Sequence, residues 1–407
     1  MGISIGMAGL GQFGPAFAEL FRAHPGVDRV ALCDREPDRM KAMAARRGWD
    51  RKFHPRDMYA SLEDLLRTDV DAVAVITQPW LHAPQCLQAM EAGKHVYSAV
   101  PVLWVPDSDE ILDACGRLIE TSRRTGRFYM LGETTYYRPE TMFCRRMAAR
   151  NAFGHFVYAE GEYFHDVDSS CNLREVYRYR SSSASGREWL ERKKRYLAAG
   201  LRDGPMHYPT HSVSGPVSVM RTRAVKVTAY GYANRNHDPF FDDSAFSDEV
   251  ALFRMANGAT VRICEFREEA GSFHESETFR VMGTAGTFAE GVWKENFRTD
   301  STPARPLAVR RPTAAEMRDP LPPDVALAFH RIAAPDATDA SDFTPQGHGG
   351  SHPYLVHEFV DAISHARQPA IHAWEAARYC AMGAMAHKSA LRDGETLAVP
   401  DFGDPPA

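Results

Sequence analysis

Two short segments of the chain concentrate histidine and tyrosine, whose side chains can carry protons in an enzyme site. The first contains Tyr163 and His165, and the second contains His207, Tyr208 and His211. A histidine or tyrosine within hydrogen-bond reach of a hydroxyl group can remove its proton and later return it. The two segments therefore predict an acid–base centre that the fold has to assemble from separate stretches of chain.

A structural role stays open for each of these histidines. His211 follows a Pro-Thr pair typical of a helix start, where its ring can satisfy buried backbone groups. His165 precedes Asp166, and this pair at a strand end also occurs as ordinary surface chemistry. For His207, substrate binding and a structural role are both open.

A glycine pattern follows the first apolar run of the chain, with Gly9, Gly11 and Gly14 spaced as Gly-x-Gly-x-x-Gly. Between a strand and a helix, these glycines allow a tight turn, close approach of a pyrophosphate, and close packing. Asp34 follows Gly14 by 20 residues, where a carboxylate accepts hydrogen bonds from a ribose and repels a 2′-phosphate. The pattern predicts NAD as cofactor, although the adjacent Arg35 weakens the preference over NADP.

Further cofactor contacts are expected after the central strand, because open parallel sheets bind ligands at the carboxyl ends of their strands. Trp80 lies in this region, where packing on the next helix is an equal alternative to cofactor contact. The predicted cofactor residues are Gly9, Gly11, Gln12, Phe13, Gly14, Asp34, Thr77, Trp80, His82, Ser98 and Glu133.

A basic segment between Arg174 and Arg202 holds nine Lys or Arg residues and only three acidic ones. Such a run is usually a solvated helix face. The sharper interpretation is that one or two of these cations bind a carboxylate, sulfonate or phosphate of the substrate. With the nearby aromatic and histidine candidates, the predicted substrate-binding residues are Tyr137, Arg178, Arg180, Lys194, His207 and His348.

The elements that would hold the glycine pattern alternate between strand and helix. Strands are predicted at 3–8, 30–33, 71–77, 95–98 and 127–131, and helices at 15–22, 37–47, 84–92 and 107–124. The run at 71–77 is too apolar to alternate, as expected of a central strand buried on both faces. This order predicts an α/β domain over residues 1–132 with a parallel, doubly wound Rossmann sheet.

From about residue 155 the pattern changes to longer alternating runs. Strands are predicted at 156–164, 225–232, 249–255, 260–266 and 279–282. Residues 300–350 are rich in Pro, Ala and Asp and are interpreted as a long, partly mobile surface loop, followed by helices at 353–366 and 373–391. The prediction for residues 133–407 is an α+β domain with a large open, mostly antiparallel sheet that binds substrate and forms oligomers.

The composition is that of a soluble globular chain, with 407 residues of which 44% are hydrophobic and 25% charged. A net charge of −5 gives no general attraction to nucleic acid or to an anionic membrane. No apolar run approaches the roughly 20 residues that span a bilayer. The seven cysteines are scattered without a Cys-x-x-Cys pair, which favours a cytoplasmic protein with reduced thiols and no structural metal.

Taken together, these features resemble the Gfo/Idh/MocA family of sugar oxidoreductases over essentially the whole chain. The resemblance rests on the glycine pattern, Asp34, the segments at 77–82 and 93–96, and the sheet domain. The family usually has Glu-Lys-Pro where this chain has Ala-Val-Pro at 99–101, so the lysine general base is absent. It also usually has Asp where His207 stands. Both departures count against an ordinary dehydrogenase mechanism.

A closer match is the branch that includes glycoside hydrolase family 109, which uses bound NAD to cleave glycosides. That branch also lacks the lysine and carries a Tyr-Pro-Thr-His segment, matched here at 208–211. Its Tyr-x-His-Asp strand end and Gly-His-Gly-Gly turn are matched at 163–166 and 347–350. The resemblance implies that Tyr208 and His211 are the main catalytic pair.

By the same resemblance, Tyr163 and His165 line the sugar site, and the protein forms a homodimer or homotetramer. The implied reaction is NAD-dependent hydrolysis of a hexopyranoside by transient oxidation at C3, elimination, water addition and re-reduction. An anionic sugar such as a sulfoquinovoside or uronide fits the basic segment. Two alternatives are a conventional NAD-dependent sugar or cyclitol dehydrogenase with His211 as base, and a non-catalytic sugar or dinucleotide sensor.

Overall fold

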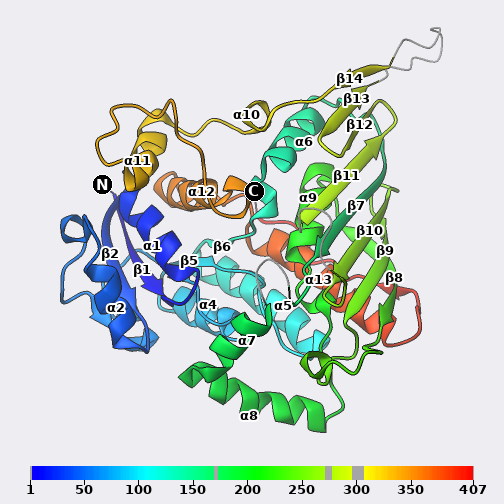
Figure 1. Ribbon diagram of the computed structural model, residues 1–407, viewed down its shortest axis with the longest axis horizontal. Helices are drawn as coiled ribbons and strands as arrows, with labels where there is room; N and C mark the ends of the chain where they lie inside the picture. Colours follow the sequence, from blue (N-terminus) through cyan, green and yellow to red (C-terminus); the bar gives the residue numbers. More distant parts are fainter. Residues whose placement is uncertain (1, 169–172, 271–276, 296–306, 407) are drawn as a thin grey trace. The chain divides into compact units, whose positions relative to one another are not determined.

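The chain folds as two compact units, neither of which is continuous in sequence. The computed structural model describes residues 2–168, 173–270, 277–295 and 307–406 (Figure 1). The first unit comprises Met1–Leu103, Ala114–Tyr137 and Pro320–Ala376, and the second comprises Trp104–Asp113, Arg138–Asp319 and Ala377–Ala407. This division differs from the single predicted boundary between residues 132 and 133, because helices near the carboxyl end pack on helix α1 of the first unit.

The first unit contains a six-stranded sheet in the order β3-β2-β1-β4-β5-β6. All of its paired strands are parallel, so the predicted doubly wound Rossmann sheet is confirmed. Its strands are β1 (Ile3–Ala8), β2 (Val27–Cys33), β3 (Met58–Tyr59), β4 (Ala72–Val75), β5 (His95–Ser98) and β6 (Tyr129–Leu131). Strand β3 escaped prediction because two residues are too few to show an alternating pattern.

Most helices of the first unit were predicted, whereas the short helix α3 and helix α11 were not. Helix α1 begins at Gly14, has a proline at its amino end, and buries Phe17 and Phe21. The helices are α1 (Gly14–Ala23), α2 (Pro37–Ala44), α3 (Leu62–Leu66), α4 (His82–Glu91), α11 (Pro323–Ala333) and α12 (His352–Ser364), with most of α5 (Ser108–Thr125). Helix α2 therefore ends three residues before the predicted position.

The second unit contains a nine-stranded sheet in the order β14-β13-β12-β11-β7-β10-β9-β8-β15. Only the β7–β10 pair is parallel among its described pairs, which confirms the predicted open, mostly antiparallel sheet. Its strands are β7 (Phe156–Phe164), β8 (Ala224–Tyr232), β9 (Asp248–Met255), β10 (Thr260–Phe266), β11 (Glu277–Gly283), β12 (Gly286–Ala289), β13 (Val292–Glu295), β14 (Ala308–Arg310) and β15 (Leu397–Ala398).

Helix α9 covers the middle of this sheet and packs on β7, β10 and β11 (Figure 1). The approach is close because Gly161 in β7 has no side chain: a Cβ atom there would lie 1.8 Å from the carbonyl oxygen of Ser212. The helices of the second unit are α6 (Pro139–Ala149), α7 (Leu173–Ser182), α8 (Ala184–Ala198), α9 (Thr210–Met220), α10 (Ala314–Met317) and most of α13 (Ala373–Ala390).

The prediction of a long loop at 300–350 is wrong for the residues that the structure describes, 307–350. This stretch contains β14, α10 and α11. Thr313 and Glu316 form a reciprocal capping box at the start of α10. Helix α11 buries Val325 and Phe329, whose spacing of four residues is that of one helix face. Proline at helix starts and alanine within helices were misread as loop composition. Residues 300–306 lie outside the described part.

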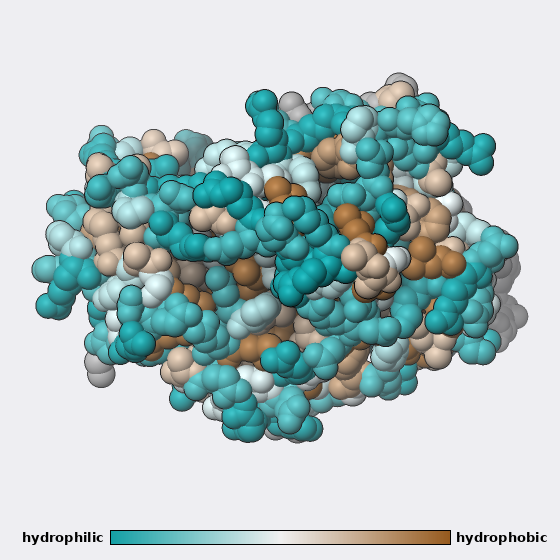
Figure 2. Space-filling model, turned by 90° about the horizontal axis from the view of Figure 1, so that it is seen from below, coloured by the Kyte–Doolittle hydropathy of each residue, from teal (hydrophilic) through white to brown (hydrophobic). Residues whose placement is uncertain are grey.

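The surface drawn in Figure 2 is mostly hydrophilic, with hydrophobic residues in small separate groups. No helix of the described chain is long and apolar enough to cross a membrane. Six cysteines in the described ranges are buried and free, and Cys171 lies outside those ranges.

Candidate functional site

The glycine loop between β1 and α1 has one open position and two crowded ones. Gly9 has a φ of +94°, and a Cβ atom there would lie 2.3 Å from the carbonyl oxygen of Ile76. A Cβ atom on Gly14 would lie 2.1 Å from the oxygen of Gly9. At Gly11 a Cβ atom would meet nothing within 4 Å, so the loop leaves space for a ligand to approach the backbone. This arrangement fits a pyrophosphate at the amino end of α1.

Asp34 lies at the end of β2 and is fixed to the glycine loop. Its Oδ2 accepts a hydrogen bond from the backbone N–H of Leu10 at 2.7 Å, and its Oδ1 accepts one from the N–H of Glu36 at 2.8 Å. Arg39 lies 3.6 Å from Oδ1. Each carboxylate oxygen can accept more than one hydrogen bond, so Asp34 can still hold the hydroxyls of a ribose. The loop and Asp34 together fit NAD.

Several other predicted cofactor residues hold the loops after β4 and β5. The two ring nitrogens of His82 lie 2.8 Å from the carbonyl oxygen of Pro101 and 3.3 Å from that of Thr77. The hydroxyl of Thr77 donates to Gln85 at 2.5 Å, and that of Ser98 donates to the oxygen of Ala99 at 2.9 Å. These contacts shape the edge of the sheet where a dinucleotide would bind.

The remaining cofactor candidates divide into exposed and buried residues. Gln12 and Phe13 are exposed on the glycine loop. Trp80 is buried, and Glu133 is buried with Oε1 accepting the N–H of Thr135 at 2.8 Å. Burial of Trp80 matches the packing alternative for this residue.

The Gly-His-Gly-Gly turn at 347–350 belongs to the first unit and lies beside the glycine loop. The ring of His348 is 5.8 Å from that of Phe13, and its Nδ1 is 3.0 Å from Nε2 of His352. Tyr137, in the same unit, is buried and stacks on Tyr354 at an interplanar angle of 6°. His348 is thus brought to the cofactor loop within this unit.

The second unit brings together the four predicted acid–base residues. The ring of Tyr163 lies 5.3 Å from that of His165 and 5.0 Å from that of His211, both edge to face. The ring of Tyr208 lies 5.6 Å from that of His211. Tyr163 and His165 come from the end of β7, and Tyr208 and His211 come from the turn into α9. We call these four residues the His/Tyr cluster.

A buried ion pair supports the His/Tyr cluster from β10. Nη2 of Arg267 donates to Oε2 of Glu265 at 2.7 Å, and Nη1 donates to the carbonyl oxygen of Tyr163 at 3.2 Å. The guanidinium carbon lies 4.6 Å from the centre of the Tyr163 ring, a cation–π contact. The hydroxyl of Ser212, next to His211, donates to Oε1 of Glu265. The strand and the helix are therefore joined behind the cluster.

Burial determines the charge of these groups. It lowers the pKa of His165 to about 4, and the positive charge of Arg267 acts in the same direction. Burial raises the pKa of Tyr163 well above its usual value, although Arg267 opposes the shift. At neutral pH His165 is therefore neutral and Tyr163 keeps its proton. Nδ1 of His165 is buried and has no hydrogen-bond partner among the described residues, so it can receive one from a ligand.

Sequence reasoning missed Glu265 and Arg267. Val261, Ile263 and Glu265 alternate along β10 and are all buried, so Glu265 occupies an inward position where apolar residues are the rule. A charged residue on the apolar side of an alternating strand was the available signal. Its register partner on β7 is Tyr163.

Three of the predicted substrate-binding residues have other contacts. His207 is buried in the second unit, where Nε2 lies 2.9 Å from the hydroxyl of Ser108 and its ring packs on His387 at 4.2 Å. Arg178 and Lys194 are exposed and form ion pairs one helical turn away, with Glu175 at 3.1 Å and Glu191 at 2.7 Å. Their local pairing matches the alternative of a solvated helix face. Among the described residues, no cluster of ligands suits a metal ion.

Arg180 differs from these three residues. It is half-buried near the carboxyl end of α7, and burial lowers the pKa of its guanidinium. The electrostatic influence of Tyr208 and Tyr163 acts against this shift. Arg180 is therefore coupled electrostatically to two members of the His/Tyr cluster.

Comparisons with known proteins agree with both units. Residues 3–132 match the GFO_IDH_MocA model, described as an oxidoreductase family with an NAD-binding Rossmann fold. The chain is 25% identical over 421 residues to a glycosyl hydrolase family 109 protein of Porphyromonas gingivalis, covering 98% of this chain and 84% of that protein. It is 25% identical over 425 residues to one of Saccharopolyspora erythraea, covering 98% and 83%.

The fold is similar to that of a levoglucosan dehydrogenase solved in complex with NADH and levoglucosan. The TM-score is 0.71 at 17% sequence identity, covering 98% of this chain and 100% of that one. This likeness supports the fold of the chain, and the fit of the glycine loop and Asp34 supports NAD as its cofactor. Residues 3–132 thus match the Gfo/Idh/MocA family of NAD-binding oxidoreductases, and nearly the whole chain is similar to proteins named glycosyl hydrolase family 109.

Proposed function

We propose that the protein is an NAD-dependent glycoside hydrolase that cleaves a hexopyranoside in a redox-neutral cycle. The observation that carries this proposal is the His/Tyr cluster, which offers four proton-carrying side chains where a simple alcohol oxidation needs one base. Val100 at the place of the usual family lysine points the same way. The similarity to family 109 proteins over 98% of the chain also supports it.

When bound, NAD would supply the oxidation of the sugar at C3 and its later reduction. The pyrophosphate would lie at Gly11 and the amino end of α1, and a ribose at Asp34. In this proposal the glycosidic bond breaks while C3 is a ketone, because the ketone makes the hydrogen on C2 acidic. Water then adds at C1, and the sum of the steps is hydrolysis.

The residues of the cluster would move the protons of this cycle. His211 takes the proton of the C3 hydroxyl as the ketone forms and returns it at the end. Tyr208 removes the proton from C2, so that the C1–O bond breaks and a C1–C2 double bond forms. Tyr163, whose raised pKa keeps it protonated, donates to the departing oxygen and recovers its proton from the water that adds at C1, while Tyr208 returns a proton to C2. His165, whose pKa of about 4 keeps it neutral, accepts a hydrogen bond from a sugar hydroxyl.

The test uses purified protein and a panel of neutral and anionic glycosides in deuterium oxide, with and without added NAD. Sugar release, NADH absorbance and deuterium at C2 are followed together. We expect sugar release with deuterium at C2 and no accumulation of NADH. The His211→Asn variant should lose about 100- to 10,000-fold in rate, as expected for a lost acid–base group. Stoichiometric NADH with the glycoside intact would instead identify a sugar or cyclitol dehydrogenase.

We also propose that the protein forms a homodimer or homotetramer through the outer face of the nine-stranded sheet. Tyr230 of β8 and Leu252 of β9 lie on neighbouring positions of this face and are 59% and 49% exposed. Large exposed apolar side chains on a sheet face are typical of an interaction surface.

A further inference from the structure

Most cations of the basic segment have local partners or are exposed, and Arg180 is the exception among those that are buried or half-buried. Ion pairs to carboxylates are formed by Arg174, Arg178, Arg192, Lys193 and Lys194. Arg187 and Arg202 donate to backbone carbonyl oxygens, and Arg195 is exposed. The guanidinium of Arg180 has no ion pair or hydrogen bond with any residue in the described ranges, although it is half-buried.

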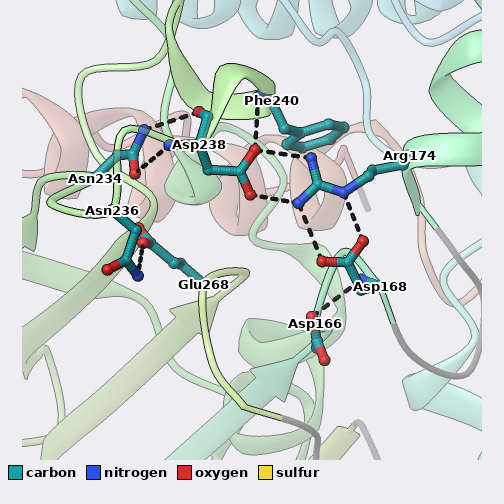
Figure 3. A network of polar contacts seen from close by, with 8 residues as sticks. All are labelled: Asp166, Asp168, Arg174, Asn234, Asn236, Asp238, Phe240 and Glu268. Atoms are coloured by element: carbon teal, nitrogen blue, oxygen red, sulfur yellow. Dashed lines mark hydrogen bonds and ion pairs between the residues drawn. The ribbon is translucent and has the colours of Figure 1, made fainter.

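Helix α7, which carries Arg180, is anchored at its amino end by Arg174. Nη1 of Arg174 donates to Asp238 at 2.8 Å, and Nε donates to Asp168 at 2.5 Å (Figure 3). The guanidinium also lies 5.3 Å from the ring centre of Phe240. Asp168 follows the strand end that bears Tyr163 and His165, so this clamp fixes α7 to the chain that leaves the His/Tyr cluster.

The carboxyl end of α7 is fixed at Arg180 itself. Both the backbone N–H and the hydroxyl of Ser183 donate to the carbonyl oxygen of Arg180, at 3.2 and 2.7 Å. A Cβ atom on Gly186 would lie 2.0 Å from the same oxygen, so the first turn of α8 packs closely against this point. The backbone that carries the guanidinium is held from both sides.

Tyr163, one of the two tyrosines that act electrostatically on the guanidinium, does not supply a negative charge. Tyr163 keeps its proton at neutral pH, because burial raises its pKa well above the usual value. A desolvated guanidinium without a counter-charge is costly, and proteins compensate such charges with a partner or a ligand. A carboxylate, sulfonate or phosphate is the group whose oxygens match the paired N–H donors of arginine.

We propose that Arg180 binds an anionic substituent of the sugar, so that the substrate class is a glycoside bearing a carboxylate, sulfonate or phosphate. This inference rests on the proposed function, because it assigns Arg180 to the same sugar site as Tyr163 and Tyr208. Nδ1 of His165, which has no partner in the described part of the chain, offers a second polar atom to the same ligand. Arg178, two residues earlier, has no such role because Glu175 pairs with it at the surface.

The experiment uses the NAD-loaded protein and matched sugars that differ only at C6: a methyl glucoside, its uronide, its 6-sulfonate and its 6-phosphate. Binding of the corresponding 1,5-anhydro sugars, which have no leaving group, is measured by calorimetry. The wild-type protein should bind at least one anionic analogue more tightly than the neutral one. In Arg180→Met this preference should fall about 100-fold, the loss expected for a buried charge-assisted contact.

Arg178→Met is the matched control, and it should keep the preference of the wild type. Arg180→Lys retains the charge but lacks the fork of donors, so it should lie between Arg180→Met and the wild type. Melting curves with NAD check that each variant is folded. The three anionic sugars distinguish which acidic group is recognised.

Two results would overturn the inference. One is a wild-type protein that binds neutral and anionic analogues equally. The other is an Arg180→Met variant that loses affinity for all analogues alike, which would assign Arg180 to the tyrosines rather than to the substrate charge. Cleavage of neutral glycosides alone would leave the proposed hydrolase in place and reject this inference. Arg180-dependent binding of an anionic sugar without cleavage would support this inference and reject the proposed hydrolase.

Discussion

Glu265 is a carboxyl group inside the second unit with none of its side chain exposed. Arg267 and Ser212 both donate to it, and each of them also adjoins a member of the His/Tyr cluster. Burial nevertheless raises the pKa of Glu265 to about 7, against the opposing effects of Arg267 and Ser212. The protonation of Glu265 therefore changes near neutral pH, next to the residues proposed to move protons.

The first prediction concerns Glu265→Gln, which keeps the shape of the side chain and removes its charge. In the wild type the folded state binds more protons than the unfolded state between about pH 4.5 and 7, so stability falls as pH rises through this window. The Glu265→Gln variant lacks this pH-dependent contribution to the free energy of unfolding. We expect the stability difference, wild type minus variant, to decline by about 3 kcal/mol from pH 4.5 to 7.5.

Denaturant unfolding at several pH values measures this difference, with m-values compared to check the unfolded state. The exposed pair of Glu175 and Arg178 provides a control for the loss of a carboxylate, since Glu175→Gln should change stability only slightly. A difference between wild type and Glu265→Gln that is constant over the window would contradict the assignment.

At the scale of elements, the prediction failed for segments that are short or buried on all sides. Strands β7, β8, β9 and β10 were predicted because each is long enough to display its alternating period, and β11 was predicted over residues 279–282. Strands β12, β13, β14 and β15 have four residues or fewer and owe their pairing to neighbours in the sheet. Helix α9 is buried all round, so it lacks the polar face by which a surface helix is predicted.

The second prediction concerns the clamp that fixes α7. Asp238→Asn removes one of the two carboxylates on Arg174, which is a partly exposed pair, and should lower stability by about 1 kcal/mol or less. The larger effect should be local, because the first turn of α7 loses its attachment to the loop of Asp238. We expect faster amide hydrogen exchange in Leu173–Ser182 and a several-fold higher KM for the sugar.

Exchange in α9 serves as the internal control for Asp238→Asn, and it should be unaltered. A variant with unchanged exchange in α7 but a raised KM would show that the clamp does not position the helix. The reverse result, faster exchange with an unchanged KM, would separate α7 from the sugar site.

At the scale of the whole molecule, each unit contains buried histidines whose pKa is lowered by burial. Burial lowers the pKa of His24 and His352 to about 3 in the first unit, and of His165 to about 4 in the second. In His24 the reason is also geometric, since Nδ1 accepts the N–H of Gly26 at 3.0 Å. Protonation of Nδ1 would place two donors against each other.

The third prediction is a loss of stability when the pH is lowered. The folded pKa values of these histidines lie below the unfolded value of 6.5, so the unfolded state binds more protons between about pH 4 and 6.5. Their contribution is complete above pH 6.5 and is lost as pH falls toward 4. Thermal unfolding should therefore show a falling Tm over this range, partly offset by Glu265, whose sign is opposite.

His24→Gln tests the origin of this loss within one unit, because glutamine does not titrate. The charged and titratable groups that act on His24 are His357, Lys52, Asp324 and Asp361. The variant should show a shallower fall in Tm between pH 6.5 and 4 than the wild type. Parallel profiles for the two proteins would mean that His24 takes no part.

The sequence by itself determined the features that depend on neighbours along the chain. The sequence predicts a dinucleotide-binding loop from Gly9, Gly11, Gly14 and Asp34, because the turn, the open backbone and the strand end all lie within one β-α-β unit. The alternating runs likewise predict the large sheet of the second unit. The four members of the His/Tyr cluster were predicted from their types, and their two segments do meet in the second unit.

Only the tertiary structure decided which cations and carboxylates are exposed, which are ion-paired, and which are buried or half-buried without an ion pair. Arg178 and Arg180 are two residues apart and alike in sequence context, yet Arg178 is exposed and paired with Glu175, whereas Arg180 is half-buried. Glu265 meets Ser212 only because α9 lies on the sheet at Gly161. Such contacts join segments far apart in the chain, so their energies depend on packing that no local pattern encodes.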